Sequence, residues 1–133
     1  MAIPVRTRWH RGAGTMPLLA LALAVCGDPS GQGSGCQSTG ADITIIAQSN
    51  NAFDKPSLTI GQGQKVCWQL SGSTTHTVTA DPATPADSNW VAFDRTLNAN
   101  TVALYTFSTV GNYPYHCVFH ATSSNMRGTI SVR

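Results

Sequence analysis

Four side chains with the donor atoms that soft metal ions prefer lie in the second half of the sequence. Cys117, His120 and Met126 fall within ten residues of one another, and His76 lies forty-one residues before Cys117. Two imidazoles and a thiolate, with a thioether as a weak axial donor, form the ligand set of a mononuclear copper site. These residue types therefore predict one bound copper ion, with His76, Cys117, His120 and Met126 as its ligands.

Other kinds of metal site fit this pattern less well. Zinc prefers four strong ligands and has no use for a thioether, and the CxxC spacing of zinc fingers is absent from the sequence. A site with two copper ions would need a second cysteine in the loop after Cys117, and that loop contains none. Because the ligands must lose their protons to bind a metal, we expect metal binding to weaken at acid pH.

The spacing of the four residues requires a particular arrangement of strands. Cys117 lies near the end of an apolar run and His120 follows three residues later, so both can turn inward around one tight loop. Met126 lies at the far end of that loop, and His76 must come from a neighbouring strand. His116 alternates with Cys117 along the predicted strand, so its side chain is expected to point away from the metal.

The residues from Asp42 onward have the pattern of short strands separated by turns. No stretch carries a helical apolar repeat over three turns, whereas β-branched and aromatic runs alternate with turns rich in Gly, Pro, Asn and Ser. This pattern predicts an all-β Greek-key sandwich or barrel of seven or eight strands. The runs are 42–48, 57–60, 65–70, 76–80, 101–107, 113–118 and 128–132.

Several aromatic residues are expected to fill the core of this sandwich. The longest gap between predicted strands, 81–96, is polar and contains prolines, but it also carries Trp90 and Phe93. A gap with such side chains is expected to pack against one sheet. Four large aromatic residues are predicted to belong to the core and not to a functional site: Trp68, Trp90, Tyr105 and Phe107.

The first 25 residues have the features of a secretory signal peptide. Residues 1–15 contain three Arg and no acidic residue, and residues 16–25 form an apolar run that is too short to span a bilayer. We therefore predict a signal peptide over 1–25, and a buried helix of the fold is the alternative. Arg6 and Arg8 are not adjacent, so a twin-arginine signal is not indicated.

Cys26 and the segment after it suggest how an exported domain is attached to a membrane. The sequence Leu23-Ala24-Val25-Cys26 resembles a bacterial lipobox, whose cysteine is lipidated, although Val25 stands where that pattern has a small residue. Residues 26–41 are rich in Gly and Ser and predict a flexible linker before a domain over 42–133. We expect an exported, periplasmic or cell-surface protein. It is attached to the membrane through a lipidated Cys26, or it is soluble after ordinary cleavage.

The distribution of charge excludes some classes of partner. The sequence has 133 residues with 8 bases and 6 acids, and three of the bases lie within the predicted signal peptide. The remaining five bases and six acids give a net charge of −1. Such a chain offers no basic surface for nucleic acid, and its charge is too small for strong electrostatic steering of a partner.

Over roughly residues 43–133 the sequence resembles the cupredoxin family of type 1 blue copper proteins. Phe53 and the residues from Pro56 to Trp68 follow, in loose form, the family rhythm Phe-x-Pro-x-x-Leu-x-Val-x-x-Gly-x-x-Val-x-Trp, and His76-Thr77-Val78 matches the segment with the first His ligand. The segment with the other ligands matches at Gly111, Tyr113, Tyr115, Cys117 and His120. The resemblance implies the same four copper ligands as the residue types do.

Three positions depart from the family pattern. Met126 follows His120 by six residues where five is usual, so the intervening loop is one residue longer. Thr77 stands where an Asn often braces the ligand loop, and a Thr hydroxyl can take over part of that role. Cys67 occupies a position before the Trp where the family commonly has another residue.

Two cysteines remain if Cys117 binds copper and Cys26 carries a lipid. In an oxidising compartment, Cys36 and Cys67 either form a disulfide that anchors the linker to the sheet, or stay free as an exposed and a buried thiol. The sequence alone leaves both possibilities open.

The resemblance implies an exported one-electron carrier in which copper alternates between Cu(II) and Cu(I). Redox partner proteins are expected to dock at the exposed edge of His120, near Phe119 and Ala121, and the carrier is expected to be a monomer. No acid–base pair or open coordination position is evident, so an enzyme is not predicted. A copper storage or delivery protein without electron transfer is the alternative, and a metal-free interaction domain is a third possibility.

Overall fold

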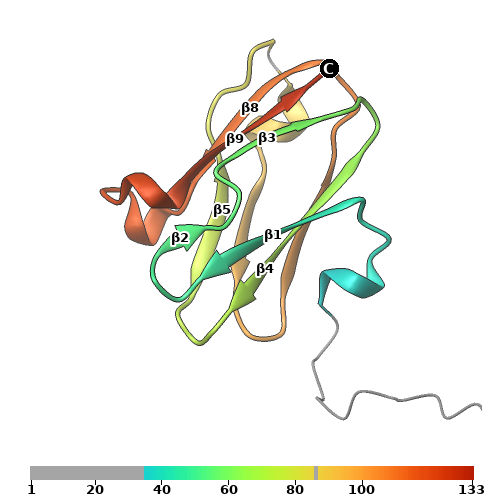
Figure 1. Ribbon diagram of the computed structural model, residues 1–133. Helices are drawn as coiled ribbons and strands as arrows, with labels where there is room; N and C mark the ends of the chain where they lie inside the picture. Colours follow the sequence, from blue (N-terminus) through green and yellow to red (C-terminus); the bar gives the residue numbers. More distant parts are fainter. Residues whose placement is uncertain (1–34, 86) are drawn as a thin grey trace, which may run out of the picture. The chain divides into compact units, whose positions relative to one another are not determined.

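The computed structural model describes residues 35–85 and 87–133 (Figure 1). The predicted signal peptide, Cys26 and the first part of the predicted linker lie outside the described residues. Within the described part of the chain, no helix is long and apolar enough to cross a membrane.

Two sheets form a β-sandwich, which confirms the predicted fold class. The first sheet has four strands, in the order β2 (Ala52–Phe53), β1 (Ile43–Gln48), β4 (Lys65–Ser71) and β7 (Val102–Thr106). The second sheet has five strands, in the order β3 (Ser57–Ile60), β9 (Arg127–Val132), β8 (Gly111–His116), β5 (His76–Ala80) and β6 (Asp94–Leu97).

Both sheets are mixed. β1 runs parallel to β4, with Ile43 opposite Val66, and β3 runs parallel to β9, with Ile60 opposite Val132. The other strand pairs are antiparallel. Since parallel neighbours cannot be joined by a hairpin, the chain crosses between the two sheets to make these pairs.

The described residues contain nine strands, where the sequence predicts seven or eight. All seven predicted runs are strands, and the two additional strands, β2 and β6, lie in segments predicted as turn and loop. β2 has only two residues, and three of the four residues of β6 are exposed, so neither carries an alternation long enough to be recognised. The gap before β6 also contains a short helix, α1 (Ser88–Val91).

The core forms around Trp68 and Trp90, both fully buried. Trp68 comes from β4 and Trp90 from α1, and their ring centroids are 6.4 Å apart. The indole N–H of Trp90 donates to the carbonyl oxygen of Asp81 at 3.1 Å. The 81–96 segment therefore packs against the core, as expected, but Trp90 contacts both sheets, since its ring lies 5.6 Å from that of Tyr113 in the second sheet. Phe107 is buried as predicted, and Tyr105 packs against the core while half-buried.

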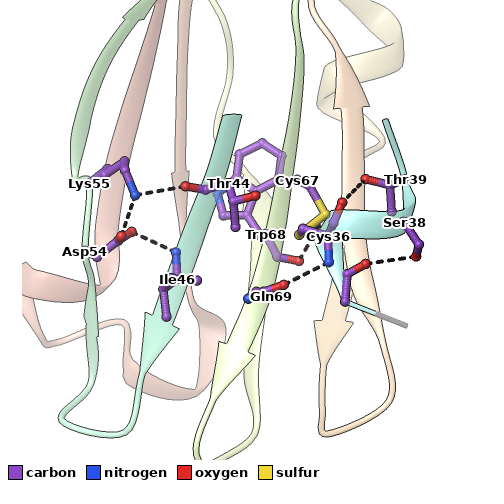
Figure 2. The surroundings of a disulfide bond; sticks show 11 residues. Cys36, Ser38, Thr39, Thr44, Ile46, Asp54, Lys55, Cys67, Trp68 and Gln69 are labelled. Carbon is purple, nitrogen blue, oxygen red and sulfur yellow. Dashed lines mark hydrogen bonds and ion pairs between the residues drawn. A yellow bond between two sulfur atoms is a disulfide. The ribbon is translucent and has the colours of Figure 1, made fainter. Parts of the chain in front are cut away.

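Cys36 and Cys67 form a disulfide bond, which decides between the two possibilities left open by the sequence (Figure 2). Cys36 begins a 3-10 helix, η1 (Cys36–Ser38), and its backbone N–H donates to Gln69 Oε1 at 2.8 Å. Val66 and Trp68 of β4 face the core, so Cys67 and Gln69 project from the outer face of the first sheet. The last residues of the predicted linker are therefore fastened to that outer face.

Candidate metal centre

Three of the four predicted ligands converge at one end of the sandwich. The candidate ligand atoms of His76, Cys117 and His120 all lie within 4.8 Å of one another. Cys117 Sγ is 3.5 Å from His120 Nδ1 and 3.9 Å from His76 Nδ1, and the two Nδ1 atoms are 3.3 Å apart. Among the described cysteines, Cys117 alone is free, and it is buried. One thiol and two imidazole nitrogens facing one point fit a single soft metal ion.

His76 is held in the orientation that a ligand needs. It opens β5 and is fully buried, and its Nε2 lies 3.0 Å from the carbonyl oxygen of Gln48 at the end of β1. A carbonyl only accepts hydrogen bonds, so Nε2 carries the proton and Nδ1 keeps its lone pair. Burial lowers the pKa of His76 and its proximity to His120 lowers it further, while the Gln48 carbonyl acts in the opposite direction. The neutral imidazole is thus favoured.

Cys117 and His120 are brought together by one helical turn. Cys117 follows β8 directly and caps the 3-10 helix η2 (Val118–His120), and the His120 backbone N–H donates to the Cys117 carbonyl at 3.2 Å. A turn of this kind places residues three apart on the same side. The strand therefore delivers the sulfur into the interior, and the turn returns the imidazole beside it.

The backbones of Met126 and Cys117 are joined by a hydrogen bond. Met126 ends the 3-10 helix η3 (Ser124–Met126), its side chain is fully buried, and its carbonyl accepts the Cys117 N–H at 3.0 Å. Both 3-10 helices follow β8, and η3 contacts β2 (Figure 1). Binding of the metal by the Met126 sulfur stays a prediction.

Thr77 braces the cysteine from the neighbouring strand. Its backbone N–H donates to Cys117 Sγ at 3.3 Å, and its side-chain Oγ1 accepts the Val118 N–H at 2.9 Å. Two hydrogen bonds from one residue thus hold both Cys117 and the residue after it. This is the role that the sequence suggests for the Thr77 hydroxyl.

His116 points to the other side of the sheet, as strand alternation predicts. Its Nδ1 lies 3.0 Å from Asp81 Oδ1, although the direction of approach is not that of a hydrogen bond. Neither residue belongs to the group formed by His76, Cys117 and His120.

The surface beside His120 is apolar. Val118 and Phe119, both on η2, expose 46% and 59% of their surface, and Ala121 is exposed as well. His120 itself is only partly buried. Its imidazole therefore reaches from the ligand group to an apolar patch at the surface, which we call the His120 patch and define as Val118, Phe119, His120 and Ala121.

Tyr115 lies on β8, the strand that ends at the site, and its buried ring leaves room only for a glycine at the paired position of β9. Its ring lies 5.0 Å from that of Phe53 and 5.4 Å from that of Trp68, and burial raises the pKa of Tyr115 to about 12. Gly128 is its cross-strand partner in β9, and a Cβ at that position would overlap the Tyr115 ring.

We expect Gly128→Ala to destabilise the domain by about 1–3 kcal/mol, because the buried ring has to shift. Since Tyr115 is two residues from Cys117, the shift should also change the spectrum of a bound metal. Urea denaturation measures the first effect. Gly61→Ala is the control, because a Cβ there meets only Gln64, at 3.5 Å. Equal stability of the two variants would contradict the packing argument.

Comparison with known proteins gives a clear result for the fold. No protein-family model matches the chain, and no curated protein sequence matches it. Many solved structures are similar. Among them are a variant of amicyanin in the reduced Cu(I) form at pH 4, an oxidised plastocyanin from Dryopteris crassirhizoma, and a purple cupredoxin from Nitrosopumilus maritimus.

These structures match most of the described chain. The amicyanin variant has a TM-score of 0.58 and 24% identity, covering 71% of this chain and 83% of its own. The plastocyanin has a TM-score of 0.57 and 24% identity, covering 68% and 99%. The purple cupredoxin has a TM-score of 0.55 and 23% identity, covering 69% and 100%. At such identities the likeness is one of architecture, and it establishes that this chain has the cupredoxin fold.

Proposed function

We propose that this domain is a type 1 blue copper protein that carries single electrons, with one copper ion alternating between Cu(II) and Cu(I). The observation that carries the proposal is the convergence of His76, Cys117 and His120 within 4.8 Å in a cupredoxin fold. The similar structures include both redox states, a reduced Cu(I) amicyanin variant and an oxidised plastocyanin.

The residues around the candidate ligands favour electron transfer over substrate turnover. His76 is fixed by Gln48, and Cys117 by Thr77 and Met126, so three hydrogen bonds resist movement of the donor atoms. Ligands that move little when the charge of the metal changes lower the cost of electron transfer. We therefore propose a carrier and not an enzyme.

We propose Met126 as the axial ligand. Its buried side chain and the hydrogen bond from the Cys117 N–H to its carbonyl support this proposal, and a weak thioether donor tunes the potential of such copper centres. The longer loop from His120 is taken up by two successive turns, in which Ser123 N–H donates to His120 and Met126 N–H donates to Ser123.

The His120 patch is the proposed docking surface for redox partner proteins. An electron leaving through the His120 imidazole would cross an apolar contact that excludes water. With a net charge of about −1 after the signal peptide, docking should depend little on ionic strength. Electron-transfer rates measured from low to high salt would test this, and a steep decrease would contradict it.

We propose that the protein acts outside the cytoplasm. The Cys36–Cys67 disulfide supports this, since such bonds persist in oxidising compartments. We further propose that residues 1–25 are cleaved and that a lipidated Cys26 attaches the protein to the periplasmic or cell-surface side of a membrane. Mass spectrometry of the protein from its membrane fraction would detect the lipid.

Addition of Cu(II) to the metal-free protein, followed by voltammetry, tests the function. The carrier hypothesis expects an intense visible thiolate-to-copper absorption at one equivalent of copper and a reversible one-electron wave. A storage or delivery protein would bind Cu(I) tightly without a reversible wave. Absence of the absorption would reject the blue copper proposal.

A further inference from the structure

A row of three side chains joins the cysteine loop to the surface of the second sheet. The Val118 N–H donates to Thr77 Oγ1 at 2.9 Å. Thr77 Oγ1 lies 3.0 Å from Thr79 Oγ1, which lies 2.8 Å from Asp94 Oδ1. Thr77 is only 3% exposed, whereas Asp94 is exposed on β6. The row thus leads from a buried residue beside the sulfur to a carboxylate in solvent.

The chemistry of the groups fixes the direction of each hydrogen bond. An ionised carboxylate only accepts, and each hydroxyl has one hydrogen to donate. Thr79 must therefore donate to Asp94, and Thr77 must donate to Thr79. The Thr77 oxygen is then left to accept from Val118, as its geometry requires. Every donor in the row has an acceptor only in this order.

Sheet register explains why these residues meet. Thr77 and Thr79 are two positions apart on β5 and so face the same side. Thr79 is directly opposite Asp94 in the pairing of β5 with β6, and Thr96 is directly opposite Thr77. Thr96 is exposed, and its side chain takes no part in the row. It is therefore a matched control.

We propose that Thr79 and Asp94 are positioning residues of the metal centre, acting on Cys117 through Thr77. The row commits the only hydroxyl hydrogen of Thr77, which fixes its side chain as the acceptor for Val118. The same residue donates its backbone N–H to Cys117 Sγ at 3.3 Å. A surface carboxylate on β6 thereby sets the hydrogen bonding around the sulfur, a property that tunes the potential of such centres. This inference rests on the proposed copper function.

The first experiment uses the metal-free protein and measures hydrogen exchange of the Val118 amide by NMR. Thr79→Val removes the acceptor for the buried Thr77 hydroxyl. We expect Thr77 to change its χ1 rotamer to reach another acceptor, which moves Oγ1 away from the Val118 N–H. Exchange should become about fivefold faster, the factor expected from one net hydrogen bond. Thr79→Ser keeps the hydroxyl and should match the wild type, as should Thr96→Val. If Thr79→Val exchanges like Thr96→Val, the positioning role is wrong.

The second experiment measures the reduction potential of the copper-loaded variants. Thr79→Val loosens the N–H···S hydrogen bond, which makes the thiolate a stronger donor to Cu(II) and lowers the potential. Asp94→Asn keeps an accepting oxygen but removes a negative charge, which disfavours Cu(II) and raises the potential. Opposite shifts support the proposal, and shifts in the same direction overturn it. If wild-type protein shows no copper absorption, the proposed function fails, and the exchange measurement still decides whether the row positions Cys117.

Discussion

Replacement of Cys117 by serine is expected to abolish the visible absorption of the copper-loaded protein. Cys117 is the one free thiol among the described cysteines, and its sulfur faces both His76 and His120. A serine oxygen is a hard donor that keeps its proton at neutral pH, so it cannot supply the charge-transfer band or a soft ligand for Cu(I). We expect Cu(I) affinity to fall by more than about 100-fold, beyond the loss typical of residues outside the ligand set.

Absorption spectroscopy with a competing Cu(I) chelator would measure both effects. His116→Asn is the matched control, because His116 adjoins Cys117 in sequence but points toward Asp81 on the other side of the sheet. That variant should keep the absorption. Persistence of the band in Cys117→Ser would reject the ligand assignment, and its loss in both variants would trace the effect to the strand and not to the sulfur.

Removal of the Cys36–Cys67 disulfide is expected to cost about 3–4 kcal/mol of unfolding free energy in the double variant Cys36→Ala/Cys67→Ala. The bond joins residues 31 apart, and closing a loop of that length restricts the unfolded chain by about this amount. Without it, one hydrogen bond among the described residues, from Cys36 N–H to Gln69 Oε1, still joins η1 to the first sheet.

Urea denaturation of the metal-free wild type and the double variant tests this value. Because the disulfide lies on the outer face of the first sheet, the double variant should still bind copper with unchanged absorption. Metal-free wild type treated with a thiol reductant should unfold at the same urea concentration as the double variant. A loss below about 1 kcal/mol would show that the η1 segment contributes little to the domain.

The sequence predicts the ligand group because its chemistry depends on residue type and order. His76, Cys117 and His120 are rare donors in a chain of short strands, and strand alternation separates His116 from them. Seven of the nine described strands can be predicted from β-branched and aromatic runs. β2 and β6 cannot, because a strand of two residues and a mostly exposed strand show no alternation of apolar and polar residues. Pairing with a neighbour, and not local propensity, makes these segments strands.

Contacts that depend on register could not be predicted. The sequence suggests a bracing hydroxyl at Thr77, but Thr79 and Asp94 meet only because β5 and β6 pair in one register. The Cys36–Cys67 bond likewise depends on which face of β4 carries Cys67. Gly128 gives no signal in a sequence with 12 glycines until the position of the Tyr115 ring is known.

The parallel pairing of β3 with β9 has a consequence for the order in which the domain assembles. β9 also pairs with β8, so the second sheet lacks its link between β3 and β8 until β9 is in place. Contacts between residues so distant in sequence form late and make folding slow. Cys117, His120 and Met126 lie in the segment between β8 and β9, and the Cys117 N–H donates to the Met126 carbonyl across that segment. The metal centre should therefore form in the last stage of folding, so a partly folded chain offers copper separate donors and no preformed site.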